Sequence, residues 1–442
     1  MDYLQILYLI VGGLIGLFIE SFSITSLREN QLRAATLSST LFMVFALIWF
    51  ASYFIFSPPD IILIVALIVV LVLATLFFMP VGSTSSLKAG PVTGRFDERD
   101  VVFSREEYQP GSDRYGQYYS MHPEYRSVDD AIRKLPELLQ PGGRYYDPIE
   151  SARIDAIFDE IQTMTTRVDG PVSNPRQQVD PTEITKAIKQ NVLQMGADDA
   201  GIAELDPMHV YSHVGRGPHP WGEPIVNNHR YVVAFSLEMR YDPVQTAPDL
   251  PITAETASRY LLGAQISIEL AEYIRSLGYP ARAHISGSNY QIILPAVAHN
   301  AGLGELGRMG YLISPRLGAR IRLGAVTTDL PLVVDKPVPF GVWDFCKRCL
   351  KCAINCPAGA ISAAGTSDVR GVHKWQLNAE QCLRYWRTIG TDCGICMKVC
   401  PYSHPPSFVH NIVRAAIRRS SFARTVSVWG DEFFYGRKLA VN

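Results

Sequence analysis

The chain's eight cysteines fall into two runs near the C-terminus, and their spacing could hold metal clusters. The first run, FCKRCLKCAINCP, has the spacing C-x2-C-x2-C-x3-C-P and contains Cys346, Cys349, Cys352 and Cys356. The second run has the spacing C-x10-C-x2-C-x3-C-P and contains Cys382, Cys393, Cys396 and Cys400. Cysteine thiolates at such spacings, with proline after the last one, ligate [4Fe–4S] clusters in ferredoxins. The sequence therefore predicts a ferredoxin-like module with two [4Fe–4S] clusters.

In two-cluster ferredoxins, the cysteine before proline ligates the other cluster, because the turn that follows the first three cysteines carries it there. We therefore expect one cluster to be held by Cys346, Cys349, Cys352 and Cys400. The other cluster is expected to be held by Cys356, Cys382, Cys393 and Cys396. A pair of zinc sites is the alternative, because zinc sites also use C-x2-C. Zinc needs neither a third cysteine at this spacing nor the C-P ending, so iron–sulfur clusters are favoured.

Length and charge limit the remaining possibilities. The chain has 442 residues, enough for two or three domains, and 41 basic residues against 42 acidic ones. This balance gives no electrostatic argument for a nucleic-acid partner. The cysteine content is far below that of a disulfide-stapled protein, which again favours metal ligation.

Three uncharged apolar runs open the sequence, at residues 3–19, 34–59 and 61–79. Each is about as long as the ~18–20 residues that cross a bilayer core as a helix. The start, MDYLQ, has no basic segment, and no twin-arginine pair precedes the first run, so a cleavable signal peptide fits poorly. We predict three transmembrane helices in contact with a lipid bilayer.

Basic residues beside these runs predict their orientation. Arg28 and Arg33 lie between the first two runs, and Lys88 and Arg95 follow the third. The positive-inside rule then places everything after residue 80 in the cytoplasm. We expect a multi-pass protein of the cytoplasmic membrane whose catalytic part faces the cytoplasm. Because all ten histidines lie outside the runs, a haem-carrying anchor is not expected.

The rest of the chain must position the clusters. We predict membrane helices at 1–80, a linker and wrapping segment at 81–180, an α/β domain at 181–340 and the iron–sulfur domain with a tail at 341–442. The wrapping segment is polar and rich in tyrosine, with one helix expected near residues 128–139.

Within 181–340, the sequence predicts a helix capped by Asp180 or Thr182 and a buried strand at 231–239. A long helix is expected to begin at Thr253 and to stop at Gly278, and a further strand is expected within 319–334. The glycines of AGLGELGRMG precede no long helix, so this segment is interpreted as a loop of close backbone approach.

Over about residues 190–440, the chain resembles corrinoid-dependent reductive dehalogenases. The resemblance is carried by MGADDAGIAELDPMHVY, AGLGELGRMGYLISPRLGARIRLGAVTTDLPL, FGVWDFCKRCLKCAINCP and the closing WGDEFFYG. It implies reductive dehalogenation of an organohalide by a nitroreductase-like α/β domain that holds a base-off corrinoid and receives electrons from the ferredoxin-like module. The sequence has no D-x-H-x-x-G motif for a histidine lower ligand, in agreement with base-off binding.

The resemblance also implies site residues. Tyr260 corresponds to the family's proton donor, with Tyr241 as the second choice, while Asn289 corresponds to the pocket asparagine and Arg322 to the basic partner of the tyrosine. A guanidinium beside the tyrosine would stabilise the phenolate left after proton donation. Residues expected to contact the cofactor are Thr256, Gly302, Gly304 and Gly307. Without the resemblance, a tyrosine on such a helix would be assigned to the core, and the strand arginine to a carboxylate such as Glu305.

Most relatives in this family carry a twin-arginine signal and use a separate membrane anchor, whereas this chain has its own apolar runs. It thus resembles the membrane-integral branch, which favours a catabolic or detoxifying role with electrons from a cytoplasmic ferredoxin or flavoprotein. Two alternatives remain. An epoxyqueuosine-reductase-like enzyme shares the cofactors, but it acts on tRNA, uses an aspartate and needs no membrane helices. A non-catalytic membrane-bound ferredoxin-type subunit would leave the α/β domain unexplained.

Overall fold

The structure is a computed structural model that describes residues 3–55, 60–82, 93–217, 219–287 and 290–439. The predicted site residue Asn289 and the topology marker Lys88 lie outside these residues. The chain forms two compact units. Unit 1 comprises Met1–Ser85, Trp343–Cys349 and His404–Asn442, and unit 2 comprises Ser86–Val342 and Leu350–Ser403. This division follows contacts rather than chain order, and the four segments inferred from the sequence stay a prediction.

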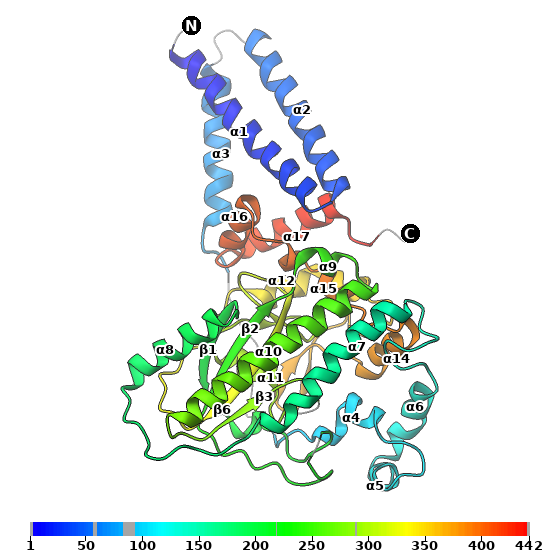
Figure 1. The fold of residues 1–442 in the computed structure, drawn as a ribbon. Helices are drawn as coiled ribbons and strands as arrows, with labels where there is room; N and C mark the ends of the chain where they lie inside the picture. Colours follow the sequence, from blue (N-terminus) through cyan, green and yellow to red (C-terminus); the bar gives the residue numbers. More distant parts are fainter. Residues whose placement is uncertain (1–2, 56–59, 83–92, 218, 288–289, 440–442) are drawn as a thin grey trace. The chain divides into compact units, whose positions relative to one another are not determined.

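Three long apolar helices form the first part of unit 1: α1 (Tyr3–Arg28), α2 (Leu32–Ile55) and α3 (Asp60–Phe78) (Figure 1). All three are long and apolar enough to cross a membrane. The first continues nine residues beyond the predicted end at residue 19, through a stretch rich in serine and threonine. Hydroxyls there bond to the helix's own carbonyls, as Thr25 Oγ1 does to Ser21 O at 2.8 Å, so these polar residues are accommodated within the helix.

Helices α1 and α2 pack closely through small and aromatic residues. The rings of Tyr8 and Trp49 stack with centroids 4.4 Å apart, and Trp49 Nε1 donates a hydrogen bond to Tyr8 O. A Cβ atom at Gly12 would lie 2.0 Å from Trp49 Nε1, so only glycine leaves room for this indole. Small residues that admit a neighbouring helix are typical of membrane helix pairs.

The C-terminal part of unit 1 contains α16 (Phe408–Ile417) and α17 (Ser421–Tyr435). A serine side chain caps the N-terminus of each helix: Ser407 accepts a hydrogen bond from His410 N, and Ser420 accepts one from Ala423 N. The fully buried Arg424 of α17 pairs with Asp344 at 2.7 Å, which ties this helix to the segment that carries Cys346.

Unit 2 is built on one antiparallel sheet with the strand order β1–β2–β6–β3. The strands are β1 (Asp199–Glu204), β2 (Tyr231–Glu238), β6 (Ile321–Thr328) and β3 (Ala281–His284). The strands predicted at 231–239 and within 319–334 are therefore confirmed. In the register of the two central strands, Val233 faces Val326 and Ala234 faces Ala325.

Both faces of this sheet are covered, so the two central strands are buried or half-buried along their whole length. Val233 and Phe235 belong to the core beneath the long helix α10 (Leu250–Ser276), which runs across the sheet in Figure 1. Val232 and Ala234, on the opposite face, pack in the core that contains α11 (Leu294–Asn300). Successive side chains of a strand point to opposite faces, so one strand contributes to both cores.

Two predicted helices are present in unit 2, one with a different start. Helix α8 (Pro181–Gln194) begins at Asp180, whose carboxylate accepts hydrogen bonds from the second and third helical residues, as predicted. Helix α10 begins after Asp249 rather than at Thr253, because Pro251 in its first turn permits an earlier start. Gly278, at φ +88°, ends it as expected.

The helix predicted at residues 128–139 is wrong in both bounds. Helix α6 runs from Pro123 to Arg133, since Pro123 opens the helix and Pro136 prevents its continuation. Helix α7 (Pro148–Thr163), which packs on α10, was not predicted at all. Four buried tyrosines hold this region together: Tyr108, Tyr115, Tyr118 and Tyr119.

The remaining elements of unit 2 are short. The helical ones include η1 (Glu98–Asp100), α4 (Val102–Glu106), α5 (Asp113–Met121), η2 (Met164–Arg167), η3 (Pro207–His209), α9 (Tyr241–Gln245), α13 (Lys351–Ile354), α14 (Ala379–Ile389), α15 (Ile395–Lys398) and η4 (Pro401–Ser403). The strands are β4 (Glu305–Leu306), β5 (Leu312–Ile313), β7 (Ser367–Val369) and β8 (Val372–Lys374). Helix α12 (Val342–Cys349) lies almost entirely in unit 1.

Candidate active site and iron–sulfur sites

Four cysteines of unit 2 line one cavity. They come from the end of the first run and from the second run: Cys356, Cys382, Cys393 and Cys396. These are the four residues that the spacing assigns to a single cluster. Pro357, Ile361 and Leu377 also line the cavity, so its walls are largely apolar, and Tyr311 and Tyr385 complete them.

The chemistry of these thiols suits a metal cluster. Burial, together with the neighbouring Cys356 and Asp392, raises the pKa of Cys382 to about 11. Burial likewise raises the pKa of Cys393 to about 12. Buried thiols therefore need a strong positive charge before they ionise, and a metal cluster supplies that charge to its ligands. The donor set thus fits an iron–sulfur cluster better than free thiols.

The other four cysteines are distributed over both units. Cys346 and Cys349 lie in α12, within unit 1, while Cys352 lies in α13 and Cys400 immediately precedes η4. The ligand set proposed for the second cluster rests on the spacing of the sequence.

Beside the cysteine-lined cavity, a buried arginine from the sheet meets a hydroxyl and a carboxylate. Arg322 of β6 donates from Nη2 to Thr256 Oγ1 of α10 at 2.8 Å, and the same nitrogen lies 3.2 Å from Asp392 Oδ2. Burial opposes the charge of Arg322, but its neighbours Tyr260, Asp392 and Tyr311 raise the pKa of the guanidinium above its ordinary value. The guanidinium is therefore held as a cation in a fixed position.

Asp392 organises this group, and the sequence interpretation missed it. It immediately precedes Cys393 and accepts hydrogen bonds from Thr253 Oγ1 at 3.0 Å and from Thr256 Oγ1 at 2.7 Å. The available signal was an acidic residue directly before the second C-x2-C motif. Asp392 thus links the cysteine-bearing segment to the helix and strand that carry the predicted catalytic residues.

Tyr260 lies one turn after Thr256 on α10, and the guanidinium carbon of Arg322 lies 5.4 Å from its ring centroid. The second choice, Tyr241 of α9, instead lies beneath Arg320, at 5.8 Å. The structure therefore brings Tyr260 to Arg322, while the ring of Tyr241 contacts the guanidinium of Arg320. Two more buried tyrosines belong to this neighbourhood. Burial and the nearby Tyr260 raise the pKa of Tyr290. Burial and the cavity cysteines raise the pKa of Tyr311.

The glycine-rich loop is a place of close backbone approach, as predicted, but its neighbours are parts of the chain itself. A Cβ atom at Gly302 would lie 2.7 Å from Lys336 O, and one at Gly304 would lie 2.2 Å from Ile313 O. A Cβ atom at Gly307 would lie 3.0 Å from the Ile313 side chain. Packing within unit 2 thus accounts for these glycines, and their contact with a cofactor stays a prediction.

The carboxylate considered as an alternative partner of Arg322 is occupied elsewhere. Glu305 accepts hydrogen bonds from the backbone nitrogens of Phe340 and Val342 at 2.8 and 3.1 Å. Burial raises the pKa of Glu305, and these backbone donors and His299 oppose that rise. Arg322 does pair with a carboxylate, but that carboxylate is Asp392.

Two family models match the chain. Residues 224–332 match the model described as "Reductive dehalogenase subunit", and residues 345–404 match the model described as "4Fe-4S dicluster domain". The first range contains Arg322, and the second contains all eight cysteines.

Curated relatives point the same way. The tetrachloroethene reductive dehalogenase of Sulfurospirillum multivorans is 33% identical over 320 residues, which cover 64% of this chain and 63% of that protein. The chain thus spans less than two thirds of the length of this relative. The epoxyqueuosine reductase of Lactococcus garvieae matches over a shorter stretch, with 31% identity over 150 residues.

Solved structures share the fold. The catabolic reductive dehalogenase NpRdhA in complex with 3-bromo-4-hydroxybenzoic acid has a TM-score of 0.64 and 25% identity, covering 78% of this chain and 47% of that one. A structure titled "Reductive dehalogenase structure suggests a mechanism for B12-dependent dehalogenation" has a TM-score of 0.66 and 26% identity, covering 80% and 48%. The chain therefore contains a segment that matches the reductive dehalogenase model, followed by a segment that matches a 4Fe-4S dicluster model, and it shares sequence and fold with reductive dehalogenases over part of their length.

Proposed function

We propose that this protein reductively removes a halogen from an organohalide, using a corrinoid and electrons delivered through two [4Fe–4S] clusters. The observation that carries the proposal is the placement of Tyr260 beside the charged Arg322, which Asp392 connects to the cysteine-lined cavity. A proton donor, a cation and an electron-carrying module are the parts that reductive dehalogenation requires.

The electron path follows from the cysteines. The cavity set, Cys356, Cys382, Cys393 and Cys396, would hold the cluster nearer to Arg322. The other cluster would be held by Cys346, Cys349, Cys352 and Cys400. Asp392 is adjacent to Cys393, so one short segment would carry both a cluster ligand and the partner of Arg322.

The corrinoid would be bound in its base-off form by a nitroreductase-like domain that contains the four-stranded sheet, with Thr256, Gly302, Gly304 and Gly307 as expected contacts. An unsatisfied polar atom supports a ligand there: Arg322 Nε is buried and has no hydrogen-bond partner among the residues that the structure describes. When bound, the corrinoid supplies the electrons that break the carbon–halogen bond.

The chain's own residues would supply the proton that replaces the halogen and stabilise the charge that is left behind. Tyr260 would donate the proton from its hydroxyl to the carbon that loses the halide. The resulting phenolate would be stabilised by Arg322, whose guanidinium lies over the same ring. Thr256 and Asp392 position the guanidinium through hydrogen bonds of 2.8 and 3.2 Å. Asn289, outside the described residues, is proposed to orient the substrate or the phenol.

Placement in the cell completes the proposal. Helices α1, α2 and α3 would anchor the protein in the cytoplasmic membrane with its catalytic part in the cytoplasm. A cytoplasmic low-potential ferredoxin or flavoprotein would then donate the electrons. No nucleic-acid partner is proposed, since the basic and acidic residues are balanced.

The direct test is halide release by the full-length protein, purified anaerobically in detergent and loaded with clusters. Brominated phenols and chlorinated ethenes are offered with a low-potential reductant, with and without added cobalamin. We expect cobalamin-dependent halide release. Cobalamin-dependent reduction of an epoxyqueuosine-containing tRNA without any halide release would favour the epoxyqueuosine-reductase-like alternative. Cluster reduction with no bound cobalamin would favour an electron-transfer subunit.

A further inference from the structure

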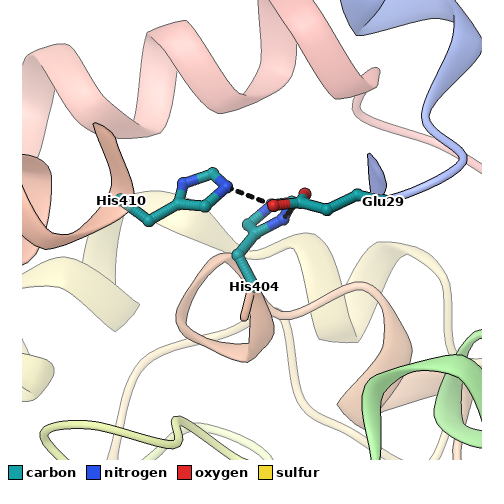
Figure 2. A group of neighbouring side chains, drawn as sticks. All are labelled: Glu29, His404 and His410. Carbon is teal, nitrogen blue, oxygen red and sulfur yellow. Dashed lines mark hydrogen bonds and ion pairs between the residues drawn. The ribbon is translucent and has the colours of Figure 1, made fainter. Parts of the chain in front are cut away.

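A second group of chemically active side chains lies in unit 1, apart from the residues discussed so far. Glu29 directly follows α1, His404 precedes α16, and His410 lies in the first turn of α16. Figure 2 shows both imidazole rings beside the Glu29 carboxylate. His404 Nδ1 lies 2.8 Å from one carboxylate oxygen, and His410 Nε2 lies 2.7 Å from the other.

The three side chains converge on a common point. One donor atom from each lies within 4.8 Å of the others, close enough for a single ion to bridge them. The imidazole rings of His404 and His410 stack with centroids 4.6 Å apart and planes 18° apart. This near-parallel arrangement directs one nitrogen of each ring toward the same carboxylate.

A fourth residue holds one of these rings in orientation. His404 Nε2, the nitrogen that faces away from Glu29, lies 3.6 Å from Asp431 Oδ1 of α17. Histidines that bind metals commonly direct their second ring nitrogen at a carboxylate, which fixes the tautomer and the ring orientation. Asp431 is in the position of such an orienting carboxylate.

The group is shielded from water. The side chain of Glu29 is 2% exposed, and those of His410 and His404 are 10% and 14% exposed. Aromatic rings stand next to the histidines, with Tyr435 centred 4.3 Å from His404 and Phe22 centred 6.5 Å from His410. A carboxylate buried in this way requires compensation by a cation or by strong hydrogen bonds.

Two imidazole nitrogens and one carboxylate form a recognised ligand set. Zn²⁺ and Fe²⁺ bind to such nitrogen and oxygen donors, whereas Ca²⁺ and Mg²⁺ prefer oxygen donors alone. We propose that Glu29, His404 and His410 bind one divalent transition-metal ion of the Zn²⁺ type, with Asp431 as the residue that positions His404. This site is separate from the cysteine clusters and does not depend on the proposed dehalogenase activity.

The ion would act as a structural clamp. Glu29 is separated from His404 by 375 residues and from His410 by 381 residues. Closing a loop of this length restricts the unfolded chain, and a bound ion stabilises the folded state that forms its site. The metal would thus fasten the segment between α1 and α2 to the C-terminal helices of the same unit.

The test uses the full-length, cluster-loaded protein in detergent, equilibrated with Zn²⁺ and then dialysed against metal-free buffer. Elemental analysis measures the retained zinc, and X-ray absorption at the zinc edge identifies its ligands. We expect about one zinc per chain, with nitrogen and oxygen ligands at about 2.0–2.1 Å that include imidazole and no sulfur at about 2.3 Å.

Variants then assign the ligands. His404→Asn and His410→Asn should each weaken zinc binding by more than ~10²-fold, and Asp431→Asn by about 10–100-fold, the usual effect of losing an orienting partner. His219→Asn, at an exposed histidine outside the cluster, should bind zinc as the wild type does. Failure of the wild type to retain zinc, a sulfur ligand in its spectrum, or undiminished zinc in the His410→Asn protein would each overturn the proposal. If a ligand variant does not fold, the wild-type spectrum alone decides.

Discussion

Replacing Arg322 by glutamine removes the positive charge beside Tyr260 while keeping an amide that can still donate to Thr256. The guanidinium carbon lies 5.4 Å from the tyrosine ring centroid. At an effective dielectric constant of about 20, a unit charge at this separation stabilises a phenolate by about 3 kcal/mol. Asp392, at 3.2 Å from Arg322, offsets part of this field. We therefore expect a net loss of about 1.4–2.7 kcal/mol, which is a 10- to 100-fold decrease in kcat.

The assay is the initial rate of halide release at saturating substrate, together with the iron and cobalt content of each preparation. Arg322→Gln should bind clusters and corrinoid in full and lose turnover only. Arg230→Gln is the matched control, because Arg230 is 68% exposed and pairs loosely with Glu204 at 3.6 Å. A change in kcat of less than about threefold in a fully loaded Arg322→Gln protein would refute the role given to this charge.

Three further predictions concern the proton donor, the glycine loop and the topology. Tyr260→Phe should lower turnover by about 10²-fold or more with cofactors retained, whereas Tyr241→Phe should stay active; the opposite result in the same halide assay would exchange their roles. Gly304→Ala places a Cβ atom 2.2 Å from Ile313 O and should destabilise the fold by about 1–3 kcal/mol, seen as a lower thermal midpoint that Gly365→Ala, in open space, does not share. A reporter active only in the periplasm should be silent when fused after residue 95 and active when fused before Tyr3; the reverse pattern would place the catalytic part outside.

Features that depend on local sequence were predictable. The apolar runs produced three helices, because their length and composition alone decide that they can span a bilayer. The central strand at Tyr231–Glu238 was predictable for a similar reason, since a strand covered on both faces contains a nearly continuous apolar run. Asp180 was one of two candidate caps, and the choice between it and Thr182 depended on which side chain reaches the helix nitrogens.

Features that depend on distant contacts were not predictable. Asp392 lies 70 residues from Arg322 in the sequence, and no local pattern joins them. The polar, tyrosine-rich segment was expected to contain one helix, but it contains several, and its tyrosine hydroxyls hydrogen-bond to charged side chains. Tyr119, for example, is buried and donates to Asp129 at 2.8 Å. Polar residues satisfied in this way do not produce the apolar periodicity by which a helix is recognised.

The same limit applies to the cluster of Glu29, His404 and His410. His404 and His410 follow the second cysteine run but form no metal-binding motif with each other in the sequence, and Glu29 comes from the opposite end of the chain. Only the packing of α16 and α17 with the segment after α1 brings the three together. Convergence of this kind is a property of the fold rather than of any segment.

The metal content of the purified protein tests the central claim most directly. After anaerobic purification and cofactor loading, elemental analysis should give about eight irons and about one cobalt per chain, as two [4Fe–4S] clusters and one corrinoid require. This result would show that all eight cysteines serve clusters and that the reductive dehalogenase domain holds its cofactor. Iron without cobalt, or zinc in place of the iron, would contradict the account.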